Sequence, residues 1–200
     1  MVNLWAVWLT ASPEVRRSYH SLLSEDERVR ADRFAFDRHR EAYELSQGAL
    51  RLLLGKYLRC AAQDVEFTLG ENGKPALRGD VGLGFNKSHS KGLALYGFAD
   101  GCDVGVDVEA DREVPQSEGI AARYFRGDEF AEPFLRVWTR KEAYVKGAGG
   151  GLTLLGNGQV PEDWMVQEAD PAPGFLGAVA YRGQRREVRF HGVLGCQDLL

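Results

Sequence analysis

The stretch that decides the fold is EAYELSQGALRLLLGKYL, residues 41–58. Its apolar residues recur every three or four positions, at Leu45, Ala49, Leu52, Leu53 and Tyr57. Because an α-helix has 3.6 residues per turn, these side chains share one face. The spacing therefore predicts a long amphipathic helix that must bury this face against another element.

Working outward from this helix, strand-like and helical patterns are mixed. Ser24 and the three acidic residues after it are typical of a helix start. Further helices are expected at 117–124 and 132–146, the second with Pro133 in its first turn and the glycine run Gly147–Gly151 at its end. Strands are expected at 4–9, 65–69, 82–85, 93–98, 104–108, 152–155, 177–181 and 187–191, with a turn at 71–75.

These elements show no regular βαβ alternation. We therefore predict an α+β fold, with a helix packed on an antiparallel sheet in each half of the chain.

Composition narrows the class of protein. The chain has 200 residues with 44% hydrophobic and 27% charged, which excludes a disordered protein, and its net charge of −4 disfavours a general nucleic-acid binder. No apolar run approaches the roughly 20 residues of a membrane span, and no secretory signal is visible. Three widely spaced cysteines, without metal-ligand spacing, favour reduced thiols in a cytoplasmic protein.

Two carboxylates stand out in Gly105-Val106-Asp107-Val108-Glu109. On a strand, Asp107 and Glu109 point to one face and the valines at 104, 106 and 108 to the other. Two like charges on one face need compensation, and a divalent cation would supply it. The alternative is a pair of exposed acids at the end of a strand.

The second charged segment is Trp138-Thr139-Arg140-Lys141-Glu142-Ala143-Tyr144-Val145-Lys146. Glu142 and Lys146 are four residues apart, so they share one helix face. They form either part of a site or a surface ion pair worth at most about 0.5 kcal/mol.

The third segment is Phe85-Asn86-Lys87-Ser88-His89-Ser90. Small hydroxyl and amide residues around a histidine, between two strands, are typical of an anion-binding turn. A histidine with a purely structural hydrogen bond is the alternative.

Taken together and in this order, the three segments resemble the motifs of the 4′-phosphopantetheinyl transferase superfamily, in its longer, surfactin-synthetase-activator-like branch. Gly73-Lys74-Pro75 is similar to the family's turn before the first motif, and Arg123-Tyr124-Phe125 with Glu129 to its helix before the last. The resemblance covers about residues 24–155.

The resemblance implies an enzyme that moves the phosphopantetheine arm of coenzyme A onto a serine of an apo acyl or peptidyl carrier protein, with Mg²⁺, and releases 3′,5′-ADP. It implies a monomeric pseudo-dimer of two similar α+β halves, which we place at residues 1–103 and 104–200, with the site in the cleft between them.

The resemblance also implies roles for particular residues. Mg²⁺ would be held by Asp107, Glu109 and Glu142, which supply the hard oxygen ligands that this ion takes. Glu142 would help to deprotonate the carrier serine, and Lys146 would stabilise the departing phosphate. Ser88 and His89 would hold coenzyme A phosphates, and the adenine would lie near Lys74 and Pro75.

Two departures from the family's pattern concern phosphate binding. Ala42 and Gln47 stand where arginines of the long helix are expected, and Arg38 and Arg40 are displaced from these positions. We expect Arg30 and Arg33 to serve instead. The second departure is Lys87, which stands in a motif position that is usually apolar and which has no assigned role.

Other classes of function remain open. One is a catalytically degenerate module that binds coenzyme A or a carrier without turnover. Another is an unrelated metal-dependent phosphodiesterase or nuclease. An acidic carrier protein suits residues 16–59, which hold 10 Lys or Arg and 7 Asp or Glu, a balance of +3. Neither a nucleic acid nor a membrane is expected as a partner.

Overall fold

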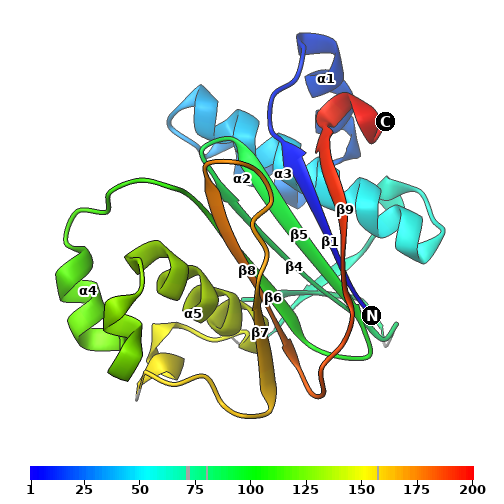
Figure 1. Cartoon of the computed structure of the whole chain (residues 1–200). Coiled ribbons are helices and arrows are strands. Elements are labelled where there is room, and N and C mark those ends of the chain that lie inside the picture. The colour runs from blue at the N-terminus through cyan, green and yellow to red at the C-terminus, as the bar shows by residue number, and fades with distance from the viewer. Residues whose placement is uncertain (71–72, 80, 157) are drawn as a thin grey trace.

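The computed structural model describes residues 1–70, 73–79, 81–156 and 158–200. Its α-helices are α1 (Pro13–Leu22), α2 (Glu25–Asp32), α3 (Asp37–Leu58), α4 (Ser117–Tyr124) and α5 (Phe134–Ala148) (Figure 1). Its strands are β1 (Val2–Trp8), β2 (Phe67–Leu69), β3 (Pro75–Leu77), β4 (Leu83–Ser90), β5 (Leu93–Asp100), β6 (Val104–Ala110), β7 (Trp164–Glu168), β8 (Phe175–Arg182) and β9 (Val188–Gly195). The mixture of helices with mainly antiparallel strands confirms the α+β class.

Two sheets organise the molecule. The first has the strand order β4-β5-β1-β9, in which β1 runs antiparallel to β5 and parallel to β9. The second has the order β6-β8-β7 and is antiparallel throughout. The final strand β9 thus returns to the first sheet. Strands β4 and β6 are edge strands of their respective sheets, which matters for the site.

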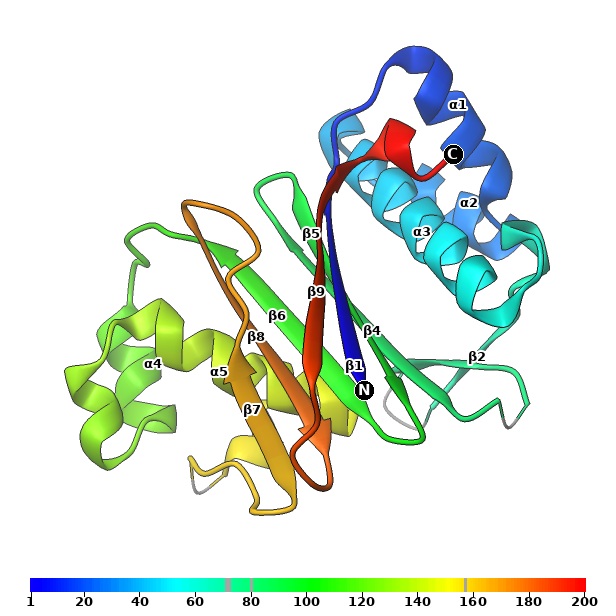
Figure 2. The same cartoon turned by 45° about the vertical axis from the view of Figure 1, so that its right-hand side comes forward.

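The elements stack in layers, with α1–α3 on the outer face of the first sheet and α5 on the outer face of the second (Figure 2). The face of α3 with Leu45, Ala49 and Leu53 packs on the first sheet, as its spacing predicts. A second core fills the space between the sheets and includes Val104, Val106 and Val108. A third core lies between α5 and the second sheet.

Helix ends follow local signals. Ser24 caps α2 through a capping box with Glu27, in which each residue's side chain bonds the other's backbone amide. Helix α5 begins after Pro133 and ends at Gly149, which has a φ of 70°. That left-handed conformation favours glycine, so the chain can turn back sharply here.

Some sequence predictions need correction. Residues 152–155 form a 3-10 turn rather than a strand, because the amide of Leu154 bonds the carbonyl of Gly151 and Leu155 is buried in the third core. Residues 85–90 are not a turn but part of β4, paired along their length with β5. The structure also contains helix α1 and strand β7, which the sequence analysis did not predict. Glu71 and Asn72 of the expected turn lie outside the described residues.

Each of these two sheets carries one long helix, α3 or α5, on its outer face, and β2 and β3 form a separate two-stranded sheet. The division into similar halves at 1–103 and 104–200 stays a prediction, with β9 crossing back to the first sheet. Among the described residues, no helix is both long and apolar enough to cross a lipid bilayer.

Candidate active site

The two sheets meet at their edge strands, β4 and β6, through the side chains of alternate β4 residues. Asn86 Oδ1 accepts a hydrogen bond from the Val106 amide at 3.0 Å, and Ser90 Oγ accepts one from the Ala110 amide at 3.2 Å. Ser88 lies between them on the same face of the strand. We call this contact the β4–β6 seam.

The predicted carboxylate pair of β6 faces the seam. The Ser88 hydroxyl donates to Asp107 Oδ1 at 2.8 Å, and the Ser90 hydroxyl donates to Glu109 Oε2 at 2.8 Å. The valines of β6 lie in the core between the sheets. The prediction that Asp107 and Glu109 share one strand face, opposite these valines, is therefore confirmed.

Asp107 is the most enclosed of the acidic side chains at the seam, with 3% of its surface exposed. The Lys146 ammonium lies 2.5 Å from Asp107 Oδ1 and 2.9 Å from Ser88 Oγ. Asp107 Oδ2 is buried and has no hydrogen-bond partner among the described residues. An unpaired buried carboxylate oxygen costs free energy, so this atom is suited to an electropositive ligand.

Helix α5 brings Glu142 to the same place. Its pKa is raised above the ordinary value, mainly by desolvation and also by the negative charges of Asp107 and Glu109, while Lys146 acts in the opposite direction. Lys146 pairs with Asp107, and Glu142 interacts through its charge with Asp107 and Glu109. Both side chains therefore lie on the face of α5 towards β6, as their four-residue spacing predicts. Segments distant in sequence converge here.

The described residues contain no preformed cluster of three His, Cys, Asp or Glu side chains close enough to hold a metal ion. The donor types nevertheless fit Mg²⁺, which takes carboxylate oxygens and keeps several other ligands. The orphaned Asp107 Oδ2 is one such oxygen. Glu109 and Glu142 are near enough for their charges to interact.

A cavity of about 560 Å³ opens on the opposite face of β4. Its lining comes from α2, α3, β3, β4 and the residues before β3, and it includes Arg30, Pro75, Lys87 and His89. None of the described lining residues is acidic. The cavity is therefore an electropositive space suited to an anionic ligand.

Not every residue predicted for phosphate binding lines this cavity. The Lys74 ammonium donates to the carbonyls of Gly147 at 2.5 Å and Val104 at 3.3 Å, so it ties its loop to the second sheet and α5. Arg33 lines a neighbouring hollow of about 670 Å³ together with Arg30. Of these two arginines, Arg30 lines both the cavity and the hollow, whereas Arg33 lines the hollow.

The displaced arginines of α3 do not line the cavity. Arg40 pairs with Asp37 at 2.7 Å, and the Arg38 guanidinium lies over the ring of Phe36, 5.1 Å from its centroid. His89 does line it. Partial desolvation and the charges of Lys87 and Lys146 lower the pKa of the His89 imidazole.

Comparison with known proteins decides the family. The model of the family described as the 4′-phosphopantetheinyl transferase superfamily matches residues 103–164. The 4′-phosphopantetheinyl transferase HetI of Nostoc sp. is 32% identical over 208 residues, which cover 91% of this chain and 88% of HetI. The chain belongs to the 4′-phosphopantetheinyl transferase superfamily.

Other members of the superfamily match smaller parts of this chain. The 4′-phosphopantetheinyl transferase Sfp of Bacillus subtilis is 27% identical over 154 residues, covering 72% of this chain and 67% of Sfp. AcpT of Escherichia coli is 38% identical over 96 residues, covering 42% of this chain and 49% of AcpT. The chain is accordingly an enzyme, a 4′-phosphopantetheinyl transferase, and the resemblance found in its motifs is confirmed.

The superfamily match includes β6 and α5, which carry the charged side chains at the seam. It also includes Lys141, a residue that sequence reasoning left without a role. Lys141 is 1% exposed, and its ammonium contacts Glu129 Oε1 at 2.8 Å and the carbonyl of Gly158. It therefore anchors α5 to the segments before and after it. The available signal was that Lys141 lies about 100° around the helix from Glu142, away from the face that Glu142 shares with Lys146.

Proposed function

We propose that this enzyme transfers the 4′-phosphopantetheine arm of coenzyme A to a serine of an apo acyl or peptidyl carrier protein and releases 3′,5′-ADP. The observation that carries the proposal is the convergence of Asp107, Glu142 and Lys146 beside a cavity whose described lining residues include Arg30, Lys87 and His89 and no acid. The reactive pyrophosphate would lie at the β4–β6 seam and the nucleotide in the cavity.

The carboxylates at the seam are proposed to hold Mg²⁺. Asp107, Glu109 and Glu142 would be the protein ligands, and Asp107 Oδ2 has no hydrogen-bond partner in the described part of the chain. The ion would neutralise charge on the phosphate under attack. Before it binds, Lys146 partly compensates Asp107 across 2.5 Å.

Glu142 is proposed to take the proton of the carrier serine, directly or through a water molecule. Its desolvated position and two acidic neighbours raise its pKa and make it a better proton acceptor than an exposed glutamate. Lys146 lies one helical turn further along α5. Its ammonium is placed to stabilise the departing phosphate oxygen.

The cavity is proposed to hold the nucleotide of coenzyme A. His89 and Arg30, which line it, would contact phosphates of coenzyme A together with Arg33 from the neighbouring hollow and Ser88 from the seam. The adenine would lie near Lys74 and Pro75. In this proposal, the side chain of Lys74 positions its loop, because its ammonium is already bonded to Gly147 and Val104.

The same proposal includes the carrier protein as partner, the cellular location and the oligomeric state. The carrier would be acidic and would dock near residues 16–59, whose balance is +3. We propose a cytoplasmic monomer whose two halves, 1–103 and 104–200, enclose the site.

The decisive experiment incubates the protein with Mg²⁺, coenzyme A and a panel of apo acyl and peptidyl carriers, and then measures each carrier's intact mass. A phosphopantetheine adduct on at least one carrier is expected, and its loss on chelation of the metal supports the Mg²⁺ requirement. Coenzyme A binding without any adduct would favour the non-catalytic alternative. That alternative is motivated by Ala42 and Gln47 at the expected arginine positions.

A further inference from the structure

Lys87 is a cation that the proposed reaction does not use. Side chains alternate along β4, so Asn86, Ser88 and Ser90 face the seam while Lys87 and His89 face away from it. Lys87 and His89 line the cavity of about 560 Å³, which has no acidic residue in the described part of its lining. The position of Lys87 in the first motif therefore places an ammonium group in the proposed nucleotide cavity.

The hydrogen-bond partners of Lys87 are neutral oxygens. Its Nζ donates to Gln47 Oε1 at 2.6 Å and to Ser46 Oγ at 3.3 Å. Among the described residues it forms no ion pair. An ammonium has three N–H donors, so a third donor is available for a ligand in the cavity.

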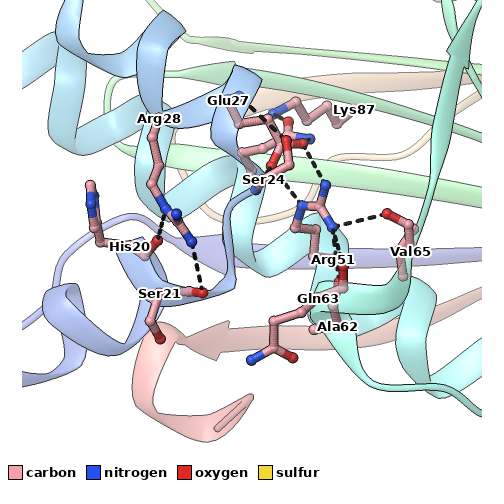
Figure 3. Close-up of polar contacts among 11 residues, drawn as sticks. His20, Ser21, Ser24, Glu27, Arg28, Arg51, Ala62, Gln63, Val65 and Lys87 are labelled. Atoms are coloured by element: carbon pink, nitrogen blue, oxygen red, sulfur yellow. Dashed lines mark hydrogen bonds and ion pairs between the residues drawn. The ribbon is translucent and has the colours of Figure 1, made fainter.

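Glu27, the acid whose charge acts on Lys87, is already in an ion pair with Arg51. Arg51 holds it through both carboxylate oxygens, at 2.6 Å from Nε and 3.1 Å from Nη2, and Gln47 Nε2 donates to it at 2.8 Å (Figure 3). Arg51 is 2% exposed and also donates to the carbonyls of Ala62 and Val65. This network holds Glu27 in place on Arg51, and Lys87 forms no ion pair of its own among the described residues.

A second unpaired cation lies nearby. The Arg30 guanidinium sits 5.4 Å from the centroid of the Tyr43 ring, and Lys87 Nζ sits 5.7 Å from the same centroid. Arg30 has no acidic partner among the described residues. Helix α2 and strand β4 thus each direct a positive charge towards one tyrosine of α3 at the cavity.

The energetics agree with a site built for an anion. The pKa of Lys87 is lowered to about 7, chiefly by desolvation, which Glu27 partly opposes and to which Arg30 adds. Other charged or titratable groups there include His89 on the same face of β4, His39 and Tyr43 in the cavity lining, and Arg51, paired to Glu27. Retaining such a lysine costs free energy in the unliganded protein, which an anionic ligand would offset.

We propose that Lys87 binds the 3′-phosphate of coenzyme A, supplying from β4 the charge that Ala42 and Gln47 do not supply from α3. This inference rests on the proposed function, since it takes coenzyme A as the ligand. The choice among its phosphates follows from the two faces of β4. Ser88 faces Asp107 and the reacting pyrophosphate, whereas Lys87 faces the cavity, where the remote phosphate is left to be bound.

The test is calorimetric binding of two ligands at pH 7.0 and low salt, coenzyme A and 3′-dephospho-coenzyme A, with no carrier present. Wild type should bind coenzyme A at least tenfold more tightly than the dephospho form. Lys87→Met should remove most of this preference while changing the affinity for the dephospho form less than twofold. Lys87→Arg should retain much of it.

Lys56→Met is the matched control, because it removes an exposed lysine of α3 outside the cavity and should leave the preference unchanged. The proposal would be overturned if Lys87→Met lowered the affinity for both ligands equally, or changed the affinity for neither. Because no carrier is used, the result is separable from the proposed transfer. If Lys87→Met loses the preference for coenzyme A but the wild type modifies no carrier, only the proposed transfer is refuted. If Lys87→Met keeps the preference and the wild type modifies a carrier, only the proposed role of Lys87 is refuted.

Discussion

Gly105 of β6 and Gly147 of α5 approach so closely that a Cβ atom on Gly105 would lie 2.6 Å from the Gly147 Cα atom. The same Cβ would overlap the Ala143 carbonyl oxygen and the Gly147 amide nitrogen. Backbone atoms cannot move aside as a flexible side chain can. This contact therefore sets the distance between β6, with Asp107, and α5, with Glu142 and Lys146.

Gly105→Ala should consequently displace α5 from β6. We expect a loss of about 1–3 kcal/mol in the free energy of unfolding, as for other overpacked cores, and at least a tenfold lower kcat. Thermal unfolding and carrier-modification rates measure the two effects. Gly119→Ala is the control, because no atom lies within 4 Å of an added Cβ in α4 and alanine favours a helix. Wild-type kcat in Gly105→Ala would contradict the interpretation.

Glu142→Gln should reduce kcat at least 100-fold, since it removes the proposed proton acceptor. It should not destabilise the protein at pH 7. The raised pKa means that the folded state binds the proton of Glu142 more tightly, so stability falls as pH rises from the unfolded towards the folded pKa. Removing the carboxylate should therefore stabilise the metal-free protein more at pH 7 than at pH 4. Unfolding in urea at both pH values checks this, and a reversed order would argue against a desolvated Glu142.

Lys87→Met should stabilise the unliganded protein at pH 7 by about 1 kcal/mol, or roughly 2–4 °C in Tm. The pKa of Lys87 falls from its ordinary 10.5 to about 7 in the folded state. The unfolded chain then holds more protons between pH 7 and 10, so wild-type stability rises across this window. The advantage of the variant should shrink towards pH 10. An advantage that is constant with pH would show that Lys87 is not desolvated.

Asn86→Ala should weaken the β4–β6 seam. It leaves the amide of the fully buried Val106 without its acceptor, which costs about 1–3 kcal/mol. Differential scanning calorimetry measures the loss. Ser21→Ala serves as the comparison, because its hydroxyl donates to the Ser18 carbonyl at an exposed position, and a change below about 0.5 kcal/mol is expected. Equal effects of the two variants would mean that the seam contributes little.

Local signals in the sequence predicted much of the site. The alternation of valine with acid in β6 placed Asp107 and Glu109 on one face, and the four-residue spacing of Glu142 and Lys146 placed them on one face of α5. Helix α1 could also have been predicted, since Ser12 caps it and Pro13 occupies its first turn. These features depend on neighbours a few residues away, and periodicity encodes such relationships directly.

Contacts between distant segments could not be predicted in this way. Residues 85–90 have the composition of an anion-binding turn, yet they form an edge strand because β5 pairs with them and β6 lies beside them. Leu152–Leu155 reads as a strand in isolation, but the glycines around it and the burial of Leu155 favour a single tight turn. Tertiary packing overrode the local preference at both places.

The amino-acid sequence by itself determined the α+β class, the faces of the principal helices and strands, and the family motifs. Only the tertiary structure decided that Asp107 meets Lys146, that Glu27 forms an ion pair with Arg51, and that Lys87 lines a cavity with no acid among its described lining residues. The reason is physical: periodicity specifies which side of an element a residue occupies, whereas charge compensation and pKa depend on what the packed chain brings within a few ångströms.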